Sequence, residues 1–203
     1  MKNKKTILKV KNDILSNLTK EQINQLVVDS QKGSKESFVK IYENFYVKVF
    51  RYIYVKCSNV QESENLTQEV FIKAFKSISS FKFRENGTSG PSFSSWIFTI
   101  ARNQIIDYYR KNSSKTESYI DNIQEEYWSV SENLEDELDN KLQFNKIIKN
   151  MEKLTSLQKE VINLRFAAQM SLSETAKILN KNENSIKSLQ HSAIKKLRDI
   201  LND

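Results

Sequence analysis

Apolar residues recur along much of the chain at steps of three and four, the spacing of an amphipathic α-helix. The clearest case lies between residues 93 and 111, and a helix of that length spans roughly 28 Å. Its apolar stripe consists of Ile97, Ile100, Ala101, Ile105 and Tyr108. We expect the rest of the first domain to pack around this helix.

Polar and cationic residues occupy the positions of this helix outside the stripe. They are Thr99, Arg102, Asn103 and Arg110, with Trp96 and Phe98 near the start of the helix. Such a face suits contact with a nucleic-acid strand, but an ordinary core helix with a hydrated polar face shows the same pattern. Gly87, Gly90 and Pro91 directly precede it, which predicts an irregular loop there.

The N-terminal half contains further helical patterns, and we expect residues 1–17 before them to be a partly disordered extension. Thr19 and Gln22 form a capping box that opens a helix, and Gly33 ends it. Longer apolar stripes predict helices over residues 35–57 and 63–79, with Phe75 on the inward side of the second helix. A polar cluster near the start of the 63–79 helix comprises Glu64, Asn65, Gln68 and Glu69. The helix dipole alone explains acidic residues in a first turn. Residues 18–112 are therefore predicted to form one helical domain.

The C-terminal half begins with a segment of unusual charge. Residues 113–140 contain nine carboxylates and no Gly or Pro, which predicts an extended acidic linker. Its acidity is compatible with mimicry of a nucleic-acid strand or with simple solubility. Beyond it, residues 141–203 show four short helical patterns, two of them opened by capping boxes at Thr155 and Ser171. Phe166 is expected in the core with the other apolar residues of the helix that Thr155 opens. The predicted fold is all-α, with two small helical domains.

The last two helical patterns describe a helix-turn-helix. Ala176 lies at the predicted crossing point, and the stretch 180–184 supplies the turn. The predicted buried face of the final helix consists of Ile186, Ala193, Leu197, Ile200 and Leu201. The opposite face consists of Asn184, Lys187, Ser188, His191 and Lys195. Amide, hydroxyl and cationic groups suit base edges and phosphates in a major groove. His191, the only histidine, also fits a neutral surface role.

Charge strengthens the case for a nucleic-acid partner. The net charge of +7 arises from +10 in residues 1–115, −9 in residues 116–140 and +6 in residues 141–203. Basic blocks of this kind neutralise phosphates and release counterions. No apolar run is long enough to cross a bilayer and no signal peptide is evident, so we expect a cytoplasmic protein without membrane insertion. The single cysteine, Cys57, excludes an internal disulfide, and we expect it to serve in helix packing.

Three stretches of the chain resemble the extracytoplasmic-function (ECF) sigma factors of the sigma-70 superfamily. Residues 64–75 and 93–111 are similar to the family's region 2, and residues 172–201 are similar to its region 4. The sequence departs from the family pattern at Asn65, at Asn180 and Lys181 in the turn, and at Leu189 and Gln190 in the final helix. The promoter sequence therefore does not carry over from the family.

The resemblance implies a role for each part of the chain. The polar cluster Glu64, Asn65, Gln68 and Glu69 would bind bacterial core RNA polymerase. The loop at residues 82–92 would capture a base of the melted non-template strand. The residues implied in binding the minus-ten element are Arg84, Asn86, Trp96, Arg102, Asn103, Arg110 and Lys111. The outer face of the final helix would read the minus-thirty-five element as duplex DNA. An anti-sigma factor is a further implied partner.

Two other functions compete with this interpretation. A stand-alone helix-turn-helix regulator would bind duplex DNA without melting it, but would not need the features of residues 63–111. A metal-dependent nuclease would use the acidic segment, although a linker offers no scaffold to fix metal geometry. We expect no catalysis, no metal and no cofactor.

Overall fold

The computed structural model describes residues 18–83, 92–112 and 150–202, and every regular element within these ranges is helical. The N-terminal extension, most of the 82–92 loop, the acidic linker and the stretch 141–149 lie outside the described residues. The predicted domain boundaries at 112 and 141 therefore stay predictions.

Within residues 18–83 and 92–112, the N-terminal domain contains four α-helices and one 3₁₀ turn. They are α2 (Lys20–Gln31), α3 (Lys35–Cys57), α4 (Val60–Ser77), η1 (Ile78–Ser80) and α5 (Phe93–Asn112). The predicted capping box is present, since the Thr19 side chain accepts a hydrogen bond from the Gln22 backbone and the Gln22 side chain accepts one from the Thr19 backbone. Gly33 follows α2 with φ 102°, a left-handed conformation that glycine adopts without strain.

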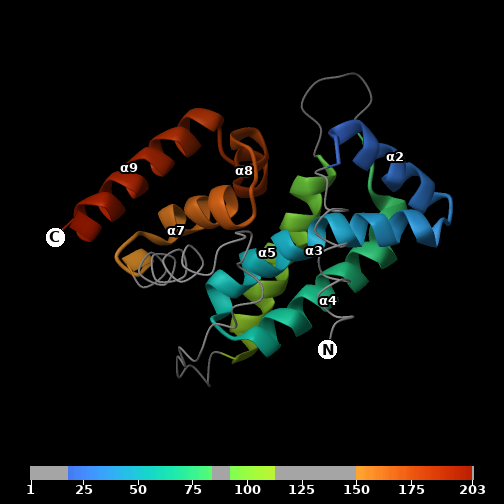
Figure 1. Cartoon of the computed structure of the whole chain (residues 1–203), viewed down its shortest axis with the longest axis horizontal. Helices are drawn as coiled ribbons and strands as arrows, with labels where there is room; N and C mark the ends of the chain where they lie inside the picture. The colour runs from blue at the N-terminus through green and yellow to red at the C-terminus, as the bar shows by residue number, and fades with distance from the viewer. Residues whose placement is uncertain (1–17, 84–91, 113–149, 203) are drawn as a thin grey trace, which may run out of the picture.

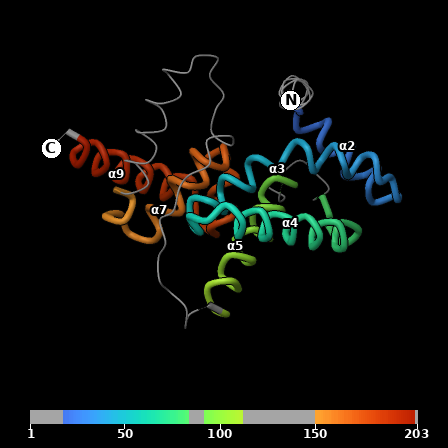
Figure 2. The backbone as a smooth tube through the Cα atoms, turned by 60° about the horizontal axis from the view of Figure 1, so that its bottom comes forward, coloured from blue at the N-terminus to red at the C-terminus, as the bar shows by residue number. Residues whose placement is uncertain are grey.

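In residues 150–202, the C-terminal domain contains α7 (Ser156–Ile162), a π-helical turn η3 (Asn163–Ala167), α8 (Leu172–Leu179) and α9 (Glu183–Asn202). Figure 1 shows this group in orange and red beside the blue and green helices of the N-terminal domain, and Figure 2 shows α3 and α4 running side by side. Both predicted capping boxes of this half are present, at Thr155 and at Ser171. The predicted all-α class and C-terminal helix-turn-helix are confirmed.

The two domains share one buried apolar cluster, which the sequence pattern does not reveal. It joins the core of α3, α4 and α5 to four residues of the C-terminal domain: Leu164, Ala168, Met170 and Ile178. The π-helical turn packs on α3, and α8 packs on α5. The described parts of the two domains therefore pack directly against each other.

Some details differ from the sequence expectations. The helix expected to start at Ser63 begins at Val60, because the Asn59 side chain caps it by accepting the Glu62 N–H at 2.9 Å. Glu64 to Glu69 therefore lie beyond the first turn, and the helix dipole does not account for them. Phe166 and Leu201, expected in the core, are exposed because they lie on the solvent side of their helices. In the described parts of the chain, no helix is long and apolar enough to span a membrane.

Candidate nucleic-acid and polymerase interfaces

The turn of the helix-turn-helix is built by Asn180. This residue ends α8 with φ 51° and ψ 51°, a left-handed conformation that asparagine tolerates better than most residues. The Lys181 N–H then donates to the Ala176 carbonyl at 2.9 Å. Ile186 of α9 is fully buried against Ala176 and Val161. This packing sets the rotation of α9 about its own axis.

All five residues predicted to read duplex DNA lie on the exposed side of α9: Asn184, Lys187, Ser188, His191 and Lys195. Asn184 falls in the first turn of the helix, since Asn182 caps α9 by accepting the Ser185 N–H at 2.7 Å. Leu189 points inward against the Ile186 cluster, and the Gln190 side chain accepts a hydrogen bond from Arg165 at 2.9 Å. The departures from the family pattern at these two positions therefore belong to the inner side of α9.

The residues predicted to hold the minus-ten strand are only partly accessible on α5. Asn103, Arg110 and Lys111 are exposed, whereas Arg102 is half-buried. Trp96 is half-buried, with its ring centroid 5.1 Å from that of Phe81 and 5.3 Å from that of Phe93. Arg84 and Asn86 lie outside the described residues.

Phe98 was expected beside the polar face of α5, and this expectation is wrong. Its side chain is fully buried, and its ring meets the ring of Tyr52 edge-on at 5.5 Å between centroids. The reason is that α5 is covered on two sides, by α3 and α4 and also by α8. The accessible face of α5 is consequently narrower than an isolated amphipathic helix would offer.

The predicted polymerase-binding residues lie together on the outer side of α4. Asn65, Gln68 and Glu69 are exposed and Glu64 is half-buried. Glu69 also accepts a hydrogen bond from the Gln104 side chain of α5, which ties this side of α4 to α5. These positions are three and four residues apart, so they form one continuous helical face.

An apolar groove adjoins this face, and the sequence interpretation missed it. The groove has a volume of about 360 Å³ between α3 and α4. It is lined by Phe38, Tyr42, Gln68, Phe71, Ile72, Phe75 and Lys76. Phe75, expected to point inward, is 48% exposed, and Ile72 is 53% exposed. The signal was present in the sequence, because the apolar run of residues 70–72 is too wide for one buried stripe.

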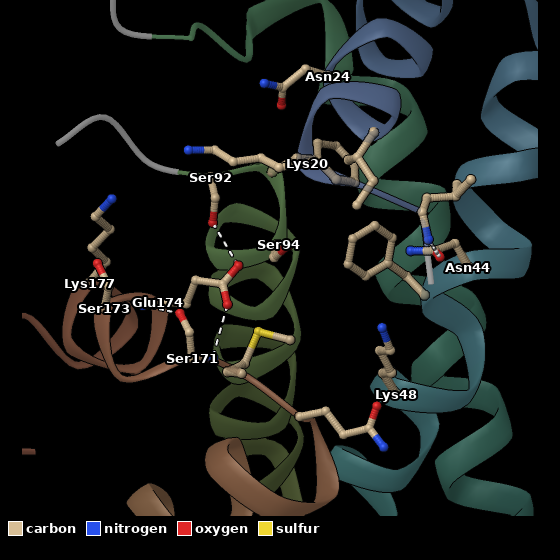
Figure 3. Close-up of a pocket in the computed structure, with 16 residues that line it drawn as sticks. Lys20, Asn24, Asn44, Lys48, Ser92, Ser94, Ser171, Ser173, Glu174 and Lys177 are labelled. Atoms are coloured by element: carbon tan, nitrogen blue, oxygen red, sulfur yellow. Dashed lines mark hydrogen bonds between the residues drawn. The ribbon is translucent and has the colours of Figure 1, made fainter. Parts of the chain in front are cut away.

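A second cavity lies where the two domains meet. Its volume is about 480 Å³, and it is bordered by the start of α5 and the start of α8 (Figure 3). Glu174 accepts hydrogen bonds there from the Ser171 N–H at 2.9 Å and from the Ser92 hydroxyl at 3.2 Å. Burial opposes its ionisation, but the hydrogen bonds from Ser171, Ser94 and Ser92 outweigh that effect and lower the pKa of the Glu174 carboxyl.

In the described ranges, no group of three or more His, Cys, Asp or Glu side chains is placed to hold a metal ion. The carboxylates of the acidic linker lie outside these ranges. Cys57 is partly buried against the core of the N-terminal domain, and burial raises the pKa of its thiol to about 12. This location agrees with the packing role expected for it.

The geometry defines a helical protein with an outward-facing helix-turn-helix. Residues 41–115 match the family model of sigma-70 region 2, and residues 151–199 match that of sigma-70 region 4. Together the two matches span more than half of the chain, in the order that the sequence resemblance anticipated.

Individual proteins that resemble the chain point to one group within the sigma-70 family. The chain is 30% identical over 179 residues to the ECF RNA polymerase sigma factor BldN of Streptomyces coelicolor, covering 88% of this chain but only 66% of BldN. It is 29% identical over 195 residues to the ECF RNA polymerase sigma factor SigW of Bacillus subtilis, covering 92% of this chain and 98% of SigW.

Solved structures of low sequence identity share the fold. CnrH, in complex with the cytosolic domain of CnrY, matches with a TM-score of 0.66 at 18% identity, covering 89% of this chain and 97% of CnrH. RpoE of Bartonella quintana, in complex with the anti-sigma factor NepR, matches with a TM-score of 0.58 at 21% identity, covering 82% and 98%. The chain belongs to the ECF sigma factors, RNA polymerase sigma factors of the sigma-70 family that recognise promoters.

Proposed function

We propose that this protein is a cytoplasmic promoter-specificity subunit, without catalysis of its own, that binds bacterial core RNA polymerase and helps to open promoter DNA. The observation that carries the proposal is the pairing of two surfaces in one chain. An exposed helix-turn-helix face lies on α9, and an exposed polar and apolar face lies on α3 and α4. A stand-alone duplex-DNA regulator has no need for the second surface.

Core polymerase binds the outer side of α4 in this proposal. Asn65, Gln68 and Glu69 supply polar contacts, while Ile72 and Phe75 supply apolar area in the adjoining groove. Interfaces commonly place a few large apolar anchors inside a polar rim, and this surface has that composition. Ile72 and Phe75 thus extend the polymerase-binding set implied by the family resemblance.

Promoter DNA binds two other surfaces. The melted non-template strand of the minus-ten element follows α5, where Arg102, Arg110 and Lys111 hold phosphates and Asn103 offers an amide. Duplex DNA of the minus-thirty-five element accepts α9 in its major groove. The uncharged Ser188 and the amide of Asn184 face base edges, while Lys187 and Lys195 hold phosphates.

An anti-sigma factor is a further proposed partner. The similar proteins CnrH and RpoE were solved in complexes with CnrY and with the anti-sigma factor NepR, respectively. The apolar groove between α3 and α4 would be one target, because covering it removes exposed Ile72 and Phe75 from water. Gel filtration of native extract should then place the protein in a complex larger than the monomer. Elution as a lone monomer would argue against this partner.

Run-off transcription tests the proposal as a whole. Purified bacterial core polymerase is combined with the full chain and a library of random promoters, and the transcript start sites are sequenced. We expect initiation from templates that share two spaced elements. If the polymerase never initiates while the protein still shifts duplex DNA, the protein is a stand-alone regulator instead.

A further inference from the structure

A buried glutamine of α5 contacts two charged side chains on the outer side of α4. The Lys73 ammonium donates a hydrogen bond to the side-chain oxygen of Gln104, and the side-chain nitrogen of Gln104 donates one to the Glu69 carboxylate. Gln104 is 7% exposed, whereas Glu69 and Lys73 are exposed. Because Glu69 and Lys73 stand four residues apart, they lie on adjacent turns of one side of α4. A single buried amide therefore holds both charges.

An amide suits this position because it meets both charges favourably. Its nitrogen only donates and its oxygen only accepts, so one end matches a carboxylate and the other matches an ammonium. Hydrogen bonds to charged groups are stronger than those between neutral groups. A glutamate in place of Gln104 would repel Glu69, and a lysine there would repel Lys73. The network is therefore specific to the residue type at position 104.

The backbone beneath this network is fixed by the apolar core. Val70 follows Glu69, Ala74 follows Lys73 and Ile105 follows Gln104 in the sequence, and all three apolar residues are buried in the shared cluster. The two helices that carry the network also pack on each other. Interiors packed in this way hold their backbones rigidly. The hydrogen bonds of Gln104 extend that rigidity to two long charged side chains.

Ordering these side chains before binding matters for affinity. Glutamate and lysine lose much rotamer freedom when they are immobilised at an interface. Side chains that are already ordered lose less, so the same contacts give tighter binding. The Glu69 carboxylate can still accept further hydrogen bonds, and the Lys73 ammonium has three donors in all. Both groups therefore stay able to contact a partner while Gln104 holds them.

We propose that Gln104 is a positioning residue for polymerase binding, which holds Glu69 and Lys73 in the orientations that contact core polymerase. This inference rests on the proposed function, because that function assigns the outer side of α4 to the polymerase. It adds Lys73 to the residues that make the contact. Gln104 itself is buried, so it acts only through the two side chains it holds.

The test measures the affinity of the full chain, labelled with fluorescein at its N-terminus, for purified bacterial core polymerase by anisotropy. Gln104→Met keeps a side chain of similar length that tolerates burial, but removes both hydrogen bonds. Gln31→Met is the matched control, since Gln31 also makes two hydrogen bonds, to backbone carbonyls of the same domain at 2.9 and 2.6 Å. Urea unfolding of each variant shows that it is folded.

The same substitution is also made in a background that lacks both charges, Glu69→Ala with Lys73→Ala. If Gln104 acts through these side chains, Gln104→Met changes nothing further in that background. A purely structural role would produce the same loss in both backgrounds. Gln104→Glu is a second variant, because it still accepts Lys73 but repels the Glu69 carboxylate.

We expect Gln104→Met and Gln104→Glu to bind core polymerase about 5-fold more weakly than the wild type, and Gln31→Met to bind like the wild type. The background without the two charges should itself bind more weakly, with no further loss from Gln104→Met. Wild-type affinity of either Gln104 variant would overturn the inference. A loss of affinity in Gln31→Met that equals that of Gln104→Met would also overturn it, as would an equal loss from Gln104→Met in both backgrounds or normal binding by the background without the charges.

Run-off transcription by the wild type decides the proposed function separately. If the wild type initiates from promoters while Gln104→Met binds polymerase normally, the positioning role alone is wrong. If the wild type never engages polymerase, both the proposed function and the positioning role are wrong.

Discussion

Glu174 connects the helix-turn-helix to α5 through a single carboxylate. Within its own domain it belongs to the capping box with Ser171, and across the interface it accepts the Ser92 hydroxyl. Burial alone would raise its pKa, but hydrogen bonds from Ser171, Ser94 and Ser92 lower it from the usual 4.5. A carboxylate whose pKa is lowered by folding stabilises the folded state only while it is ionised.

Glu174→Gln tests this contribution through its pH dependence. Glutamine preserves the size of the side chain and an accepting oxygen, so the substitution removes mainly the charge. The free energy of unfolding of the wild type should exceed that of the variant at pH 7. The difference should shrink as pH falls below about 4.5 and through the lowered folded-state pKa. Urea unfolding of both proteins at pH 7 and pH 3 measures this difference in the free energy of unfolding. An equal difference at the two pH values would show that the charge of Glu174 does not stabilise the fold.

At the scale of single elements, the outer side of α4 combines exposed polar and apolar residues. The apolar ones form a groove only because α3 packs beside α4. Its inner side is buried through Leu66, Val70 and Ala74. Ile72 and Phe75 remain in the groove shared with α3, next to the polar cluster. Exposed apolar side chains that adjoin a polar rim favour an interface rather than a folding role.

Phe75→Glu should therefore damage polymerase binding and lower stability only modestly. We expect run-off transcription at limiting protein to fall about 10-fold, because an apolar anchor is replaced by a charge. The free energy of unfolding should fall by only about 1 kcal/mol, since the side chain is 48% exposed, although its ring meets that of Phe38 edge-on at 4.9 Å between centroids. Ser156→Glu adds the same charge at an exposed site on α7 and is expected to transcribe normally. Full activity of Phe75→Glu would exclude the groove from the polymerase interface.

The exposed face of α9 makes a separate prediction for duplex DNA. Lys187→Ala should weaken binding to a promoter recovered in the run-off experiment, and should reduce the slope of log K against log salt by about 1. Anisotropy titrations at several salt concentrations provide the slope. Lys35→Ala, an equal loss of charge at an exposed site on α3, serves as the control. An unchanged slope for Lys187→Ala would count against a phosphate contact.

At the scale of the whole molecule, the shared cluster couples the two domains. Residues of α3, α4 and α5 bury their apolar surface against Leu164, Ala168 and Ile178 of the C-terminal domain. Domains that share a core unfold together more often than domains joined only by a linker. Calorimetry of the wild type should accordingly show a single cooperative transition.

Ala168→Glu should divide that transition into two, because it disrupts the interface while most of each domain's own core remains. Two transitions in the wild type would mean that the cluster contributes little coupling. Both proteins are compared at the same concentration and pH, so that a difference in the number of transitions comes from the substitution itself.

Local patterns were enough to predict most helices and the rotation of α9. Capping boxes at Thr19, Thr155 and Ser171 involve residues within one turn, so they form wherever those residues stand in a helix start. Apolar spacing identified the inner side of α9 through Ile186, Ala193 and Leu197. The start of α4 was misplaced because Asn59 caps it outside the apolar pattern. The roles of the predicted DNA- and polymerase-binding residues stay predictions.

The sequence alone determined the all-α class, the helix-turn-helix and the family, because periodicity, capping and family motifs are local properties of the chain. Only the tertiary structure decided that Phe98 is buried, that Ile72 and Phe75 stay exposed, and that Glu160 meets Arg102. These facts depend on which helices pack together although they are far apart in the sequence. The neighbours of a residue in the sequence do not determine such distant partners. The environments of Phe98, Ile72 and Phe75 are set by helix packing within the N-terminal domain, and the contact of Glu160 with Arg102 is set by packing between the two domains.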